Sequence, residues 1–224
     1  MSLYTFPSYK KPNCDLQPDG LLIAESTNTA LLSELAEVPI ANITERLANN
    51  NKAYIAYMSG QPAAFGWLAN EEIQIGELGH KATLPFGHKY LWNFRTLAQY
   101  RGLSIYPALL VHILKATKYS TIRYWIIHAP ENNASLKGIR KAGFEHVGKL
   151  FLNDDNTVAV EQTATSKSLE KHLRQLGIQI STNASPSCWN CSSPFYKKRS
   201  DECCCIAAKL ECSGPRSNRM MAQY

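Results

Sequence analysis

The chain is poor in cysteine and in long apolar runs over most of its length. Only one of its seven cysteines, Cys14, precedes residue 188. A body with one cysteine needs no disulfides, which is usual in a reducing compartment, so we expect a cytoplasmic protein. No apolar stretch approaches the roughly 20 residues of a membrane helix, and residues 1–7 lack the charged and apolar regions of a signal peptide. These features predict that the protein has no membrane partner.

Concentrated charge is also scarce. The formal net charge of the 224 residues is +6. Residues 186–224 contain six Lys or Arg and three Asp or Glu, which accounts for +3, and the other +3 is spread over the rest of the chain. A nucleic-acid-binding domain usually gathers its basic residues on one face. We therefore expect no nucleic-acid partner, while the oligomeric state is left open by the sequence.

Strand-like and helix-like patterns alternate along the chain, which predicts a mixed α/β fold. A chain of this length is large enough for one well-buried domain. We expect helices at 28–38, 41–49, 107–117, 132–142 and 166–177. We expect strands at 21–25, 53–58, 63–68, 72–78, 90–97, 122–128, 144–152 and 157–162.

A basic turn that contains glycine lies between a predicted strand and a predicted helix. Its sequence is Gln99-Tyr100-Arg101-Gly102-Leu103-Ser104-Ile105-Tyr106-Pro107. The first N–H groups of a helix have no partner within the helix, and the helix dipole adds positive potential there. Gly102 lets the backbone approach a ligand closely, and Pro107 removes a donor that the helix start does not use. The turn therefore predicts a binding site for a phosphate group.

A second motif follows the predicted strand at 122–128. It reads Asn132-x-x-Ser135-x-x-x-Ile139-x-Lys141-x-Gly143-Phe144. Asn132 or its neighbour Asn133 can cap a helix, Gly143 is a typical helix stop, and Phe144 begins another apolar stretch. The motif therefore predicts a strand, a helix and a strand in that order.

Together, the two motifs resemble those of the GNAT superfamily of acyl-CoA-dependent N-acyltransferases, over about residues 20–162. The first motif matches the family's acyl-CoA loop, with Gln99 and Gly102 in place and Ser104 as a small-residue variant. The second matches the strand and helix that follow this loop in the family. The resemblance implies an α/β fold with a mixed, twisted central sheet, splayed central strands and flanking helices. It also implies acetyl-CoA or a longer acyl-CoA as the co-substrate.

The resemblance further implies where this co-substrate binds. Backbone N–H groups from about Arg101 to Tyr106 would hold the pyrophosphate, and the backbone of Thr96 and Leu97 would pair with the pantetheine amides like an added strand. Asn132 would contact the pantetheine arm or act only as a helix cap. The predicted cofactor-binding residues are Thr96, Leu97, Gln99, Arg101, Gly102, Leu103, Ser104, Ile105, Tyr106, Asn132 and Ser135.

The catalytic groups are less clearly marked. Glu77 is the first candidate for the base, because it is an acidic residue in an otherwise apolar predicted strand. Asn93, on the strand before the acyl-CoA loop, could orient the amine. Many members of the family carry a tyrosine where this chain has Ile139, and that tyrosine protonates the departing thiol. A nearby hydroxyl, that of Ser104 or Tyr106, could replace it, or water could serve.

The C-terminal residues form a different region. Six of the seven cysteines lie within 188–212. A C-x-x-C pair can hold a metal ion with two thiolates, and the later cysteines could supply two more. The predicted zinc ligands are Cys188, Cys191, Cys203 and Cys204, and a loose or oxidised tail is the alternative. We divide the chain into a GNAT-like domain (1–164), a connecting helix and linker (165–185) and a cysteine-rich basic tail (186–224).

We therefore expect an N-acyltransferase that transfers an acyl group, in the first place acetyl, from acyl-CoA to a primary amine. The amine could belong to a small molecule, an amino acid or a peptide side chain. A module that binds or senses acyl-CoA without catalysis is one alternative, and a longer-chain transferase acting on a peptide is another. Gly138 bears on this choice, because glycine within a helix costs roughly 1 kcal/mol relative to alanine. It could make room for the acyl donor or for packing.

Overall fold

The computed structural model describes residues 1–13, 17–129, 132–153, 155–161 and 166–182. The strands are β1 (Ser2–Pro7), β2 (Leu21–Ser26), β3 (Lys52–Met58), β4 (Gln61–Ala69), β5 (Glu72–Ile75), β6 (His80–Thr83), β7 (His88–Thr96), β8 (Arg123–His128), β9 (Glu145–Leu152), β10 (Val158–Glu161) and β11 (Gln179–Ser181). The helices are α1 (Thr29–Ala36), α2 (Ile40–Ala48), α3 (Ile105–Thr117), α4 (Asn133–Ala142) and α5 (Lys167–Gln175). Three 3₁₀ turns are η1 (Gly76–Leu78), η2 (Ala98–Tyr100) and η3 (Lys118–Ser120).

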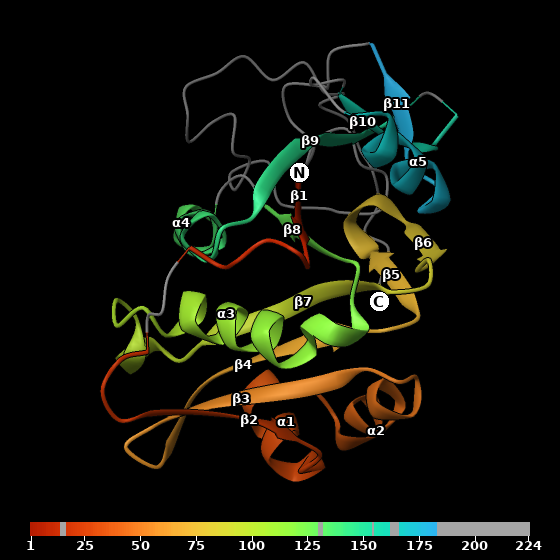
Figure 1. Ribbon diagram of the computed structural model, residues 1–224. Coiled ribbons are helices and arrows are strands. Elements are labelled where there is room, and N and C mark those ends of the chain that lie inside the picture. The colour runs from red at the N-terminus through yellow and green to blue at the C-terminus, as the bar shows by residue number, and fades with distance from the viewer. Residues whose placement is uncertain (14–16, 130–131, 154, 162–165, 183–224) are drawn as a thin grey trace, which may run out of the picture.

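Nine of the strands form one mixed sheet in the order β11-β10-β9-β1-β8-β7-β4-β3-β2, with helices packed against it (Figure 1). The pairs β7–β8 and β10–β11 are parallel, and the other pairs in this sheet are antiparallel. The predicted mixed α/β fold is therefore confirmed. None of the helices in the described residues is both long and apolar enough to cross a membrane.

The two parallel strands at the centre of this sheet separate half-way along β7. Pairing with β8 runs from His88 opposite Arg123 to Leu91 opposite Ile126 and goes no further. The second half of β7, residues 92–96, keeps β4 as a neighbour on its other side. One edge of this half-strand therefore has no strand partner among the described residues, which is the splay that the family resemblance implies.

Helices cover both faces of the sheet, and β3 shows how the sequence assigns them. Tyr54 and Ala56 are buried in the cluster that contains the apolar face of α3. Ala53 and Ile55, which alternate with them, are buried in the cluster under α1 and α2. Successive side chains of a strand point to opposite faces, so α3 lies on one face and α1 and α2 on the other.

An N-terminal strand that the sequence analysis missed lies near the middle of the sheet. β1 pairs with β8 on one side and β9 on the other, both antiparallel. Five of its six residues are buried, from Leu3 to Pro7. Burial on both faces removes the alternation of polar and apolar residues by which a strand is recognised in a sequence.

The sheet also continues into the segment that the sequence assigned to a linker. The predicted helix at 166–177 is present as α5, with Ser166 as its N-cap. β11 then adds a parallel strand beside β10. Leu173, Leu176 and Ile178 are fully buried against the body, so residues 167–181 are part of the same core.

The predicted strand at 72–78 ends earlier than expected. β5 stops at Ile75, and a 3₁₀ turn follows over Gly76–Leu78. β5 pairs with β6 in a separate two-stranded sheet. Glu77 therefore lies on a turn beside the small sheet, rather than on a strand of the central one.

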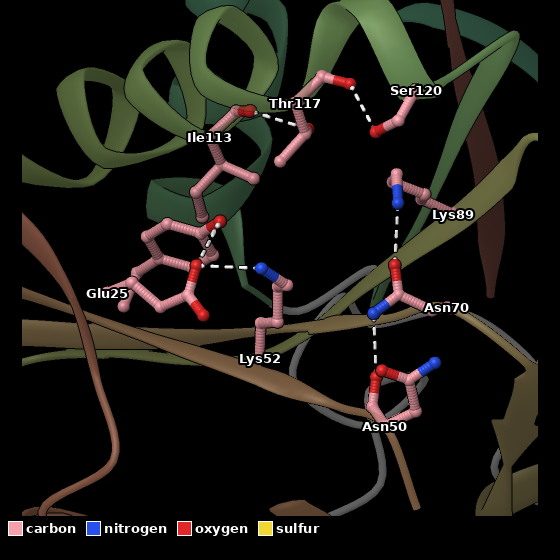
Figure 2. A network of polar contacts seen from close by, with 9 residues as sticks. Glu25, Asn50, Lys52, Asn70, Lys89, Ile113, Thr117 and Ser120 are labelled. Atoms are coloured by element: carbon pink, nitrogen blue, oxygen red, sulfur yellow. Dashed lines mark hydrogen bonds and ion pairs between the residues drawn. The ribbon is translucent and has the colours of Figure 1, made fainter.

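Polar contacts tie together the loops at the amino-terminal end of β7 (Figure 2). The Lys89 ammonium donates to Asn70 Oδ1 at 2.6 Å, and Asn70 Nδ2 donates to the Asn50 carbonyl at 2.6 Å. The Asn50 side chain donates in turn to Glu71 Oε1 at 2.9 Å. This network fixes β7 to the α2–β3 loop and to the β4–β5 turn.

Candidate functional site

A cavity of about 800 Å³ lies where β7 ends and α3 begins, with α4 as its other wall. This volume is within the usual range for ligand pockets, about 300–1,000 Å³. β7 contributes Phe94, Arg95 and Thr96; η2 and the turn contribute Tyr100, Arg101, Gly102 and Ser104; α3 contributes Ile105, Tyr106 and Pro107; and the α4 side contributes Asn132, Ala134, Ser135, Lys137, Gly138 and Lys141.

The turn before α3 has the geometry of an anion cradle. Gly102 has φ +85°, and a Cβ placed there would meet nothing within 4 Å, so this position is open as well as left-handed. Ser104, the N-cap of α3, also has positive φ, and its side chain makes no capping bond. The N–H groups of the first helical turn thus have no side-chain cap and are left for water or a ligand.

Positive charge surrounds this cradle, and none of the described residues that line the cavity is acidic. Lys141 Nζ donates to Ser104 Oγ at 3.0 Å, which brings the end of α4 to the start of α3. Arg101 folds back onto the turn, with its Nε 3.4 Å from the Thr96 carbonyl. Lys137 lies one helical turn from Lys141. This end of the cavity suits a ligand with several negative charges.

Aromatic and small residues also line the cavity. The rings of Phe94 and Tyr106 meet edge to face, with centroids 5.5 Å apart. The Tyr106 hydroxyl lies 3.4 Å from Ser135 Oγ of α4. Burial raises the pKa of Tyr106 well above its usual range, so the hydroxyl keeps its proton at neutral pH.

The ring of Tyr106 explains why α4 has a glycine at position 138. A Cβ at position 138 would lie 2.3 Å from Tyr106 Cδ1, a distance that no real contact allows. Of the two sequence-based explanations, packing is therefore observed directly. Ile139 beside it is fully buried in the core and does not line the cavity.

The start of α4 is held from two directions. Asn132 caps the helix, its Oδ1 accepting from the Ser135 N–H at 3.0 Å. The buried His128, the last residue of β8, donates from Nε2 to the Asn132 carbonyl at 2.9 Å. The capping role of Asn132 is thus observed, and its contact with a pantetheine arm stays a prediction.

The structure brings together most of the residues that the sequence predicts for cofactor binding. Leu97, Gln99 and Leu103 do not line the cavity: Leu97 packs towards α1 and α2, and the other two side chains are exposed. The predicted residues that do line it are Thr96, Arg101, Gly102, Ser104, Ile105, Tyr106, Asn132 and Ser135.

Two of the predicted catalytic residues lie outside the lining of this cavity. Glu77 is on η1, next to the small sheet. Asn93 is exposed on β7, where the register with β4 shifts between Phe65 and Trp67. Its φ of +49° marks it as the residue at which the strand deviates. The third candidate, Ser104, lies in the anion cradle, and all three roles stay predictions.

Several lining residues were missed by the sequence analysis as ligand-binding residues. They are Phe94, Arg95, Tyr100, Pro107, Ala134, Lys137 and Lys141. For Lys137 and Lys141, the signal was their spacing of four residues on a predicted helix, which puts both on one face. Phe94 had no such signal, because the bulge at Asn93 decides which way the next side chain points.

The predicted zinc ligands Cys188, Cys191, Cys203 and Cys204 lie outside the described residues. Within the described residues, no cluster of three or more His, Cys, Asp or Glu side chains is arranged to hold a metal ion. The zinc site therefore stays a prediction from the sequence.

A second, smaller cavity of about 490 Å³ lies at the other end of β7, lined in part by His88 and Lys89. Trp125 Nε1 donates to His88 Nδ1 at 3.1 Å, and the His172 ring of α5 packs edge to face on the other side. Burial, with His172 and Arg123 nearby, lowers the pKa of His88 to about 4. The His88 imidazole is therefore uncharged at neutral pH, and the charged side chains that line this cavity are Glu71 and Lys89.

Comparison with known proteins gives likenesses of structure only. No family model matches the chain, and no curated protein matches it. Among solved structures, it is similar to a GCN5-related N-acetyltransferase from Kribbella flavida, with 13% identity over 65% of this chain and 53% of that one, and a TM-score of 0.44. The chain thus spans about half the length of that structure.

Two further solved structures have similar scores. One is a GNAT-family acetyltransferase from Colwellia psychrerythraea, with 17% identity, 65% of this chain and 52% of that one covered, and a TM-score of 0.46. The other is an aminoglycoside 6'-N-acetyltransferase from Acinetobacter baumannii, with 14% identity, 60% and 97% covered, and a TM-score of 0.45.

The elements of the chain itself define the fold class. A mixed sheet with flanking helices has a parallel central pair that separates half-way, and a glycine turn opens the helix beside the gap. This is the GNAT-like fold that the sequence predicts, and that prediction is confirmed.

Proposed function

We propose that the protein is an acyl-CoA-dependent N-acyltransferase that transfers an acyl group, in the first place acetyl, to a primary amine. The observation that carries the proposal is the position of the cavity. The cavity extends from the anion cradle at the start of α3, where basic side chains gather, to the unpaired edge of the second half of β7. Phosphates and an extended amide-containing arm are the two chemical parts of coenzyme A that such a site can bind.

The phosphate end of the coenzyme fits the cradle. Backbone N–H groups at a helix start bind phosphate without a specific side chain. Arg101, Lys137 and Lys141 add charge that can pair with the pyrophosphate and the third phosphate of the coenzyme. Charge-assisted hydrogen bonds of this kind are roughly twice as strong as neutral ones.

The pantetheine arm fits the open strand edge. Residues 92–96 of β7 have no partner on the β8 side in the described part of the chain, and Phe94, Arg95 and Thr96 line the cavity. An extended chain with two amides can add to such an edge through main-chain hydrogen bonds. The thioester would then lie beyond Thr96, towards Phe94, where the strands have separated.

The chemistry requires little beyond positioning. The neutral amine attacks the thioester carbonyl, the tetrahedral adduct loses the thiolate, and an amide remains. Holding both reactants in the gap can contribute a large part of the rate. Glu77 and Asn93 are the residues we propose for collecting the amine proton and orienting the amine.

Calorimetry with acetyl-CoA and thiol release with a panel of primary amines test the proposal. We expect a dissociation constant in the micromolar range and turnover with at least one amine. Binding without turnover would favour an acyl-CoA sensor, to which the aliphatic Ile139 also points. Absence of binding by the full chain would contradict the proposal as a whole.

Longer acyl donors distinguish the remaining alternative. The bulky rings of Phe94 and Tyr106 line the cavity, and Phe94 lies near the proposed position of the acyl group. We therefore expect acetyl-CoA to be used better than octanoyl-CoA. A higher kcat/KM with the longer donor would instead support a longer-chain transferase.

A further inference from the structure

Three of the six histidines lie where α5 packs against the rest of the chain. They are His80 of β6, His88 of β7 and His172 of α5 itself. α5 and the strand that follows it, residues 167–181, are the last elements that the structure describes. The contacts of these histidines therefore help to hold this end of the described chain on the body.

Hydrogen-bond geometry requires both rings of the His88–His172 contact to be neutral. The two rings meet edge to face, with centroids 4.7 Å apart. Trp125 Nε1 can only donate, and it donates to His88 Nδ1 at 3.1 Å, so a proton on that nitrogen would remove the acceptor. His172 Nδ1 is buried and has no hydrogen-bond partner among the described residues. A charged His172 would therefore bury an N–H group without an acceptor, which is costly.

Positive charge already faces this pair of rings. Arg123 of β8 acts on both of them, and Lys171 of α5 acts on His172. The adjoining cavity contributes one charge of each sign, Glu71 and Lys89. Two protonated rings at this separation would repel each other as well as the guanidinium. A proton on either ring thus opposes the contact.

His80 holds the other end of α5 in a different way. Its Nε2 lies 2.8 Å from the Leu176 carbonyl, which can only accept, so the histidine donates. Gly177 follows with φ +69°, and a Cβ there would lie 3.3 Å from His80 Cε1, so glycine suits this close approach. Burial lowers the pKa of His80 too, but its protonated ring would keep this donor. The acid-sensitive contact is therefore the one between His88 and His172.

From these contacts we infer that the His88–His172 pair is a pH-sensitive attachment of α5, which releases residues 167–181 from the body when either ring is protonated. The inference does not rest on the proposed function. The buried side chains of Leu173, Leu176 and Ile178 hold the segment in place while both rings are neutral. Protonation of histidines at a packed interface is a known way of switching such a contact.

The size of the effect follows from the change in environment of His88. Its pKa is about 4 in the packed state, against an ordinary value of 6.5 that the ring regains when α5 moves away. The attachment is therefore complete above pH 6.5 and weakens as the pH falls towards 4. Between pH 7 and pH 5, the ratio of open to packed molecules should rise by about 20-fold from this group alone. Burial lowers the pKa of His172 as well, which acts in the same direction.

Hydrogen exchange of the full chain at pH 7 and pH 5, corrected for the intrinsic exchange rates, tests the inference. Amides of residues 167–181 should lose about 20-fold of their protection at pH 5, while those of α3 keep theirs. His88→Gln keeps an acceptor for Trp125 and cannot be protonated, so it should reduce this loss to a few-fold. His112→Gln is the matched control: burial lowers the pKa of His112 too, but its ring faces Tyr54 and not α5.

The outcomes decide the inference without any measurement of acetyl-CoA binding or turnover. A loss of protection confined to residues 167–181, reduced in His88→Gln but not in His112→Gln, supports it. An equal loss in α3 would show general unfolding and overturns it, as does the same loss in His88→Gln as in the wild type. If His88→Gln does not fold, as judged by its melting curve, His172→Gln decides in the same way, because it removes the other ring.

Discussion

The two halves of β7 differ in how they are paired within the sheet. The first half, up to Leu91, is paired on both sides and ends in a network of amide and ammonium groups (Figure 2). The second half has lost its partner on one side and borders the larger cavity. One strand thus anchors the sheet at one end and offers a binding edge at the other.

Charge follows the same division. His88, in the first half, is 3% exposed and neutral, because burial and its cationic neighbours disfavour a further positive charge. Arg101, Lys137 and Lys141, which line the larger cavity beside the second half, are exposed. Exposed cations thus border the second half of β7, whereas the buried imidazole of His88, in its first half, is uncharged at neutral pH.

The largest expected effect comes from placing a negative charge in the anion cradle at the start of α3. Gly102→Glu puts a carboxylate in the cradle, so acetyl-CoA affinity should fall at least about 100-fold, or close to 3 kcal/mol. Gly60→Glu is the matched control: Gly60 also has positive φ and open space around it, but lies in the β3–β4 turn. Both variants should melt at similar temperatures. Equal acetyl-CoA affinities in the two by calorimetry would remove the cradle from the site.

The variant Ile139→Tyr tests whether the side chain at this position belongs to the core or to the cavity wall. Ile139 is fully buried, so Ile139→Tyr overpacks the core and should lower the free energy of unfolding by about 2 kcal/mol. Urea denaturation measures this directly. A variant as stable as the wild type, with higher turnover, would mean that the side chain reaches the cavity after all.

Acid should lower the free energy of unfolding through His88, in the first half of β7. The pKa of His88 in the folded state, about 4, is below its ordinary value of 6.5. Its contribution to stability is therefore complete above pH 6.5 and is lost as the pH falls towards 4. We expect a loss of about 1 to 2 kcal/mol between pH 7 and pH 5 from this group.

Urea midpoints across this pH range, compared between wild type and His88→Gln, measure the contribution. Glutamine keeps an acceptor for Trp125 Nε1 but has no proton to gain, so the variant should show a flatter dependence on pH. Identical pH dependences of the urea midpoint in the two proteins would mean that protonation of His88 does not contribute to stability. His172, whose pKa is also lowered by burial, is in ring contact with His88, so His172→Gln and the double variant complete the comparison.

The smallest effect should come from removing one of the cationic side chains that line the larger cavity. Lys141→Gln deletes a charge but keeps a donor for Ser104, so acetyl-CoA should bind about 5- to 10-fold more weakly, or near 1 kcal/mol. Added salt should narrow the difference. Lys171→Gln, an exposed lysine on α5, is the control. A similar loss in both variants would indicate a general charge effect instead of a contact in the cavity.

Much of this site could be predicted from the sequence because its signals are local. Gly102 and Pro107 mark the turn and the helix that it opens, and the structure has α3 starting at Ile105. Asn132 and Gly143 mark the ends of α4, and both act as predicted. β1 and β11 were missed, because their neighbours in the sheet come from distant parts of the chain.

By itself, then, the sequence determined most of the elements, though not β1, β6 or β11, and the glycine turn that opens α3, since caps, glycine turns and hydrophobic periodicity act over a few residues. Only the tertiary structure decided that β7 separates from β8 after Leu91, that Gly138 receives the ring of Tyr106 and that Ile139 turns into the core. These features depend on contacts between residues about thirty or more positions apart. Their energies come from packing and burial, which no local pattern records.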